Sequence, residues 1–116
     1  MRIAVVAVGR LKQGPERELA ARYAARISGA GRALGVTGFE VVEIPESRAR
    51  RDADRRAEEA DAIIGKLGPG AVVVFDERGR SPTSEDFAAR IGAWRDEGRA
   101  ALSAVIGGPD GLCDTV

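Results

Sequence analysis

The chain has 116 residues, of which 44% are hydrophobic and 31% charged, a composition typical of one folded domain. Its 18 basic and 18 acidic residues balance, which excludes binding to a polyanion through a strong overall field. The chain has no histidine and one cysteine, Cys113, which excludes an internal disulfide and predicts no metal site. No apolar run approaches the roughly 20 residues of a membrane-spanning helix. The N-terminus does not resemble a signal peptide, so we expect a cytoplasmic protein.

The first third of the chain predicts a strand followed by a helix. Residues 2–8 form a continuous, β-branched apolar run that ends at Gly9, which is typical of a buried parallel strand. Pro15 suits the first turn of a helix, where its missing N–H has no cost. The expected apolar stripe of this helix consists of Leu19, Tyr23 and Ile27, with Ala20 and Ala24 beside them.

The remaining elements continue the same alternation. We expect strands at residues 39–44, 71–75 and 101–106. A helix over residues 52–67 should bury the face formed by Ala53, Ala57, Ala60, Ile64 and Leu67. Another helix, capped by Thr83 or Ser84, should pack through Phe87, Ile91 and Trp94.

This order of elements predicts an α/β fold. Four apolar strands joined by helices favour a parallel sheet with helices on both faces, in a single domain over residues 1–116. After the fourth strand, residues 109–112 are expected to turn into a further helix. Because the chain ends soon afterwards, at Val116, the domain is expected to be incomplete at its C-terminus.

The segment after the fourth strand is the strongest candidate for a ligand site. Ligands of open α/β sheets bind beyond the carboxyl ends of the strands, and Gly107 and Gly108 would let the backbone approach a ligand closely. The sequence Gly108-Pro109-Asp110-Gly111 also fits an ordinary type I turn. From the residues alone, a ligand loop and a plain turn are equally good interpretations.

Two charged segments are further candidates. Asp76 follows the third strand, where a carboxylate could act on a proton, and Arg78 and Arg80 could contact phosphate. From the residues alone, a solvated charged loop is the favoured interpretation of this segment. Residues 47–56 hold a basic cluster at a helix start, where cations oppose the helix dipole. A phosphate partner would explain the cluster, and a surface network with Asp52, Asp54, Glu58 and Glu59 is the alternative.

Four segments occur together in the order and spacing of a known family. They are IAVVAVGRLK, FEVVEIPESR, VVVFDERGRSPTSEDFA and VIGGPDGL. The chain therefore resembles, over its whole length, the bacterial large-subunit (23S) ribosomal RNA pseudouridine N3-methyltransferases, which belong to the SPOUT class of α/β-knot enzymes.

The resemblance implies a homodimeric, S-adenosyl-L-methionine-dependent enzyme that acts on RNA in the assembled ribosome. It implies cofactor-binding roles for Phe75, Gly107 and Gly108, and RNA contacts for Arg48, Arg50 and Arg51. No residue present is a convincing general base, so the catalytic residue is unknown, and Asp76 is the best remaining carboxylate. The resemblance also implies that residues 1–116 lack the family's knot-closing C-terminal segment. Two alternatives therefore stand beside the enzyme: a non-catalytic α/β module that binds a nucleotide or RNA, and an inactive fragment.

Overall fold

The computed structural model describes residues 1–113 and 116, and it has the expected alternation of strands and helices. The strands are β1 (Arg2–Val8), β2 (Gly38–Ile44), β3 (Ala71–Phe75) and β4 (Ala101–Ile106). The helices are α1 (Pro15–Ala30), the short 3₁₀ helix η1 (Gly31–Leu34), α2 (Asp52–Ile64) and α3 (Ser84–Asp96). Thr83 caps α3, since its side chain accepts the Asp86 N–H at 3.0 Å.

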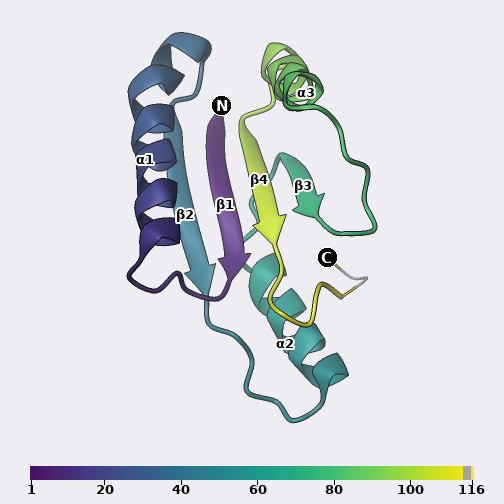
Figure 1. The fold of residues 1–116 in the computed structure, drawn as a ribbon. Coiled ribbons are helices and arrows are strands. Elements are labelled where there is room, and N and C mark those ends of the chain that lie inside the picture. Colours follow the sequence, from purple (N-terminus) through teal and green to yellow (C-terminus); the bar gives the residue numbers. More distant parts are fainter. Residues whose placement is uncertain (114–115) are drawn as a thin grey trace.

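The four strands form one sheet in the order β2-β1-β4-β3, and every neighbouring pair is parallel. The chain moves one way along the sheet from β1 to β2 and the opposite way from β2 to β3. Right-handed crossovers therefore place α1 and α2 on opposite faces, and α3 returns to the face of α1 (Figure 1). The predicted parallel sheet with helices on both faces is confirmed.

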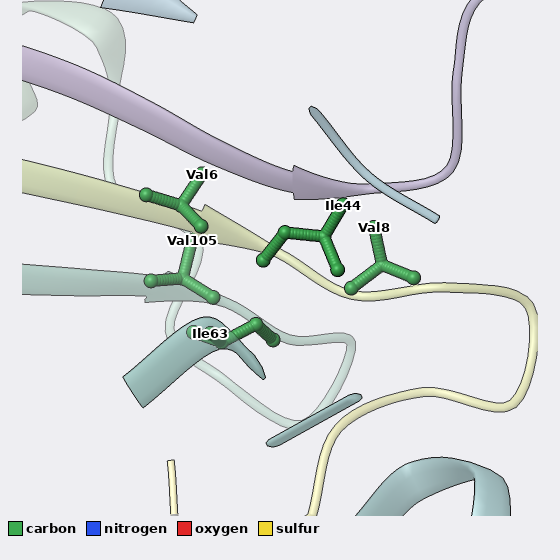
Figure 2. Close-up of a cluster of buried hydrophobic side chains, with 5 residues drawn as sticks. All are labelled: Val6, Val8, Ile44, Ile63 and Val105. Atoms are coloured by element: carbon green, nitrogen blue, oxygen red, sulfur yellow. The ribbon is translucent and has the colours of Figure 1, made fainter. Parts of the chain in front are cut away.

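The core lies between α2 and the sheet. Figure 2 shows its buried side chains, which come from β1, β2, β4 and α2: Val6, Val8, Ile44, Val105 and Ile63. In the strand register, Val6 is paired with Val105 and Val8 with Ile44, so these side chains share one face of the sheet. This packing places the start of α2 near the carboxyl ends of the strands.

The predicted inner face of the second helix is only partly confirmed: Ala60 is buried and Leu67 packs against the core, but three of the five predicted residues are exposed. Ile63 is fully buried, whereas Ile64 is 44% exposed and Ala53 and Ala57 are also exposed. The helix ends at Ile64 rather than at residue 67. The inner face carries Arg55 and Glu59 at helical spacing before Ile63. A stripe defined by apolar residues alone therefore lies at an angle to the buried face of the helix.

The other face of the sheet is covered less completely. The predicted apolar stripe of α1 is not buried, because Leu19 and Tyr23 are 52% and 54% exposed. The third strand is also less buried than expected, since β3 is at the edge of the sheet and Val72 and Phe75 are exposed. The Phe75 ring meets Phe87 of α3 edge-on, with ring centroids 6.0 Å apart. No helix among the described residues is long and apolar enough to span a membrane.

Candidate functional site

A cleft of about 750 Å³ lies beyond the carboxyl ends of β3 and β4. Three segments line it: the first turns of α2, the residues that follow β3, and the turn that follows β4. The lining includes Phe75, Asp76, Arg78, Gly107 and Gly108. The structure thus brings together five of the residues that the sequence singled out, from segments more than 25 residues apart. The cleft occupies the position where open α/β sheets bind their ligands.

The turn after β4 is held in place by packing around its glycines. The Gly111 N–H donates to the Gly108 carbonyl oxygen at 3.0 Å, which confirms the expected turn. A Cβ on Gly107 would lie 2.7 Å from Leu112 Cγ, and one on Gly108 would lie 3.0 Å from Val8 Cγ1. Neither glycine has a positive φ, which in this turn occurs at Gly111 (φ +82°). Close packing, rather than a left-handed backbone, therefore excludes side chains at Gly107 and Gly108. No helix follows this turn at Leu112 or Cys113, and the rest of the expected helix lies at residues 114–115, outside the described residues.

Arg55 of α2 fastens this turn to the helix. Its Nε and Nη2 donate to the two carboxylate oxygens of Asp110 at 2.6 and 3.1 Å, a two-pronged pairing. Its Nη1 donates to the backbone carbonyl oxygens of Ala49 and Arg50, both at 3.0 Å. The hydrogen bond from Arg55 lowers the pKa of Asp110, and the pairing raises the pKa of Arg55. Asp110 is therefore a fixed anion rather than a proton acceptor.

Glu59 lies one turn further along α2 than Arg55 and packs against Gly108. Only 3% of its surface is exposed. Its Oε2 accepts the Ser47 N–H at 2.9 Å, while its Oε1 is buried with no hydrogen-bond partner. That Oε1 would lie 3.1 Å from a Cβ on Gly108. A buried carboxylate oxygen without a donor is destabilising, so its place next to the glycine turn calls for an explanation.

The segment after β3 carries the carboxylate that was the candidate base. Asp76 accepts the Arg78 N–H on Oδ1 and the Arg78 guanidinium on Oδ2, both at 3.0 Å. These hydrogen bonds lower the pKa of Asp76. The carboxylate is therefore charged near neutral pH and better suited to accepting hydrogen bonds from a ligand than to removing a proton.

The basic segment, residues 47–51, leads directly into α2. Arg48, Arg50 and Arg51 are exposed, and among the described residues none of the three has an acidic partner within salt-bridge distance. The alternative of a surface ion-pair network holds only for their neighbours, since Arg55 pairs with Asp110 and Arg56 with Asp52. Arg80 is exposed and lies outside the cleft lining. The segment thus presents three unneutralised cations beside the cleft.

Sequence reasoning missed the roles of Arg55 and Glu59. It placed both in a surface charge cluster, because charged side chains are mostly exposed. Their spacing of four residues from each other, and of four from Glu59 to the fully buried Ile63, is the signal that could have found them. The described residues contain no group of three or more side chains suited to holding a metal ion.

Comparison with known proteins places the chain in a family. A family described as "Predicted SPOUT methyltransferase" matches residues 1–116. The chain belongs to the SPOUT methyltransferase family. It is 59% identical over 118 residues to the "Ribosomal RNA large subunit methyltransferase H" of Methylorubrum extorquens (strain PA1), covering 100% of this chain and 72% of the relative.

Two further relatives carry the same name. The protein of Rhodopseudomonas palustris (strain TIE-1) is 58% identical over 113 residues, covering 97% of this chain and 71% of its own. That of Bradyrhizobium sp. (strain ORS 278) is 56% identical, covering 97% and 70%. The resemblance read from the four sequence segments is confirmed, and with it the expectation of a methyltransferase.

Proposed function

We propose that this SPOUT methyltransferase transfers a methyl group from S-adenosyl-L-methionine to N3 of a pseudouridine in large-subunit (23S) ribosomal RNA. The observation that carries the proposal is the cleft at the carboxyl ends of β3 and β4, lined by the close-packed glycine turn, in a chain that shares more than half its residues with named ribosomal RNA methyltransferases.

The cleft suits the cofactor in size and in chemistry. Its volume of about 750 Å³ falls within the range of small-molecule sites, about 300–1,000 Å³. Phe75 offers a half-exposed aromatic ring for a base, and Gly107 and Gly108 line the cleft with backbone atoms alone. The ionised Asp76 complements a positively charged ligand. These are the residues that would hold S-adenosyl-L-methionine.

The chemistry requires mainly positioning. The cofactor, when bound, supplies a methyl group on a sulfonium, which is already a good leaving group. The protein must therefore hold the ring nitrogen in line with that methyl group and favour its deprotonated form. The lowered pKa of Asp76 makes this carboxylate a weak base, and we assign it the role of a hydrogen-bond acceptor in the cleft.

The basic segment supports a nucleic-acid substrate. Arg48, Arg50 and Arg51 precede α2, whose first turns line the cleft, so phosphates bound there would lie next to the cofactor residues. Arg78 lines the cleft itself and can contact phosphate while it stays bonded to Asp76. We assign Arg80 to the same RNA surface because of its place in the exposed loop after β3.

Methyl transfer to ribosomes tests the proposal directly. Ribosomes that lack the modification are incubated with the protein and S-adenosyl-L-methionine labelled in its methyl group. We expect label in large-subunit RNA, and mass spectrometry of its nucleosides should identify N3-methylpseudouridine. Label in a different nucleoside would contradict the assigned position. Cofactor binding without any transfer to ribosomes or free ribosomal RNA would favour the non-catalytic binding module.

We further propose that the protein acts as a homodimer in the cytoplasm, where assembled ribosomes are found. The support is the family resemblance and the large apolar side chains left half-exposed on the sheet and on α1, including Val41, Val72 and Tyr23. Sedimentation velocity over a range of protein concentrations tests the dimer. A single species with the mass of one chain at every concentration would contradict it.

A further inference from the structure

Arg55 and Glu59 each contact two loops at once. Both lie on the inner face of α2, one helical turn apart. Arg55 binds Asp110 in the glycine turn with two nitrogens and the carbonyl oxygens of residues 49 and 50 with the third. Glu59 binds the Ser47 N–H with one oxygen and lies against Gly108 with the other. The two side chains therefore join the basic segment, residues 47–51, to the glycine turn, residues 107–111.

The geometry of these contacts makes the joint stiff. A planar guanidinium that donates to both oxygens of one carboxylate fixes orientation as well as distance. The Arg55 and Asp110 side chains are about three-quarters buried, and Glu59 is almost completely buried. The unmatched Oε1 of Glu59 shows that this arrangement is not optimised for stability alone, since a buried carboxylate oxygen normally has a donor.

We propose that Arg55 and Glu59 are positioning residues that hold the glycine turn in register with the basic segment, so that RNA and cofactor bind cooperatively. RNA phosphates on Arg48, Arg50 and Arg51 would reduce the motion that residues 47–51 retain, and the contacts of Arg55 and Glu59 would transmit that reduction to residues 107–111. A turn that is already ordered loses less conformational entropy when cofactor binds. Coupling of this kind is reciprocal, so cofactor must tighten RNA binding by the same factor. The cooperative part rests on the proposed function, whereas the positioning part does not.

Hydrogen exchange in the ligand-free protein tests the positioning. Two amides are reporters: Gly111, bonded to the Gly108 carbonyl, and Ser47, bonded to Glu59. Arg55→Lys keeps the charge but loses the two-pronged pairing, so we expect exchange at Gly111 to rise about tenfold with β1 unchanged. Arg99→Lys, in an exposed pair with Glu97, is the matched control and should exchange like the wild type. Unchanged exchange at Gly111 in Arg55→Lys overturns the proposal.

Glu59 is tested at its own reporter with a conservative rescue. Glu59→Ala removes the acceptor of the Ser47 N–H and should raise exchange at Ser47 about tenfold. Glu59→Gln retains an acceptor oxygen and should restore protection there. If both variants exchange like the wild type at Ser47, Glu59 does not position the basic segment and the proposal fails.

The coupling is measured with S-adenosylhomocysteine and a hairpin RNA as probes. In the wild type we expect the RNA to tighten S-adenosylhomocysteine binding about fivefold or more. In Arg55→Lys this ratio should fall towards one, whereas a merely structural role would weaken binding equally with and without RNA. A ratio of one in the wild type, or a wild-type ratio in the variant, overturns the coupling. If neither probe binds the wild type, the proposed function fails and the coupling with it, while the exchange experiments still decide the positioning.

Discussion

At Gly108, the space for a side chain is occupied by Val8 on one side and by Glu59 on the other. The same residue faces the cleft through its backbone. One glycine therefore serves both the packing under the turn and the access of a ligand to it. Substitutions there should affect stability and binding together, and a control at an unobstructed glycine separates the two.

Gly108→Val should destabilise the fold by about 1–3 kcal/mol, because the new methyl groups overpack a closed site, and should abolish cofactor binding. Urea unfolding and titration with S-adenosyl-L-methionine on the same preparation check both effects. Gly29→Ala is the control, since nothing lies within 4 Å of a Cβ at this helical position. It should stabilise the protein by about 0.5–1 kcal/mol. Normal cofactor affinity in Gly108→Val would show that the segment is a plain turn with no role in cofactor binding.

Asp110 should make stability depend on acidity. The hydrogen bond from Arg55 holds its pKa below the ordinary value of 3.8, so the folded state favours the ionised form. The pair therefore contributes fully above that value, and its contribution is lost as the pH falls from about 4 through the folded pKa. Urea unfolding at a series of pH values should show a flatter acid limb for Asp110→Asn than for the wild type. Parallel curves would show that the pair adds no pH-dependent stability.

At the scale of the element, α2 does the most to organise the molecule. Its inner face contributes Ile63 to the core, and the preceding turns contribute Glu59 and Arg55 beneath the site. The same helix thus anchors the sheet at one end and supports the cleft at the other. Its two adjacent isoleucines differ sharply in burial, which provides an internal comparison of how the helix is oriented.

Ile63→Ala should destabilise the protein by about 2–5 kcal/mol, because it leaves a cavity among Val6, Val8, Ile44 and Val105. Ile64→Ala makes the same chemical change at a position that is 44% exposed, and should cost less than about 1 kcal/mol. Urea unfolding of the two variants measures the difference. Equal losses would mean that the helix is rotated relative to the arrangement in Figure 2.

At the scale of the whole molecule, balanced charge means that attraction to RNA must be local. The chain has zero net charge, and within residues 1–113 the three exposed arginines of the basic segment have no acidic partner within salt-bridge distance. Each phosphate contact releases counterions, so the dependence of RNA affinity on salt counts these contacts.

Replacing Arg48, Arg50 and Arg51 with Gln should weaken ribosome binding and lower the slope of log affinity against log salt by about 2–3. Cofactor affinity measured without RNA should not change. A second triple variant, in which Arg22, Arg26 and Arg32 become Gln, removes the same charge from α1 and η1 and should keep the wild-type slope. Equal loss of slope in both variants would indicate a response to net charge rather than local docking.

The sequence by itself determined the alternation of strands and helices, the turn at residues 108–111 and five of the residues that line the cleft. These features depend on local pattern: β-branched runs form strands, glycine and proline stop them, and parallel strands bring their carboxyl ends to one edge. The methyltransferase class came separately, from the resemblance of four segments to one family.

Only the tertiary structure decided the strand order, the inner face of α2 and the partners of its charged residues. Arg55 and Asp110 are 55 positions apart in the chain, and no periodicity links them until the sheet places β4 beside β1. An apolar stripe predicts where hydrophobic side chains gather, but a buried Glu59 and a partly buried Arg55 satisfy their charges through loops that meet only in the folded state. The spacing of Arg55, Glu59 and Ile63 marks a shared helix face, but the partners of that face come from distant segments, which a local pattern does not encode.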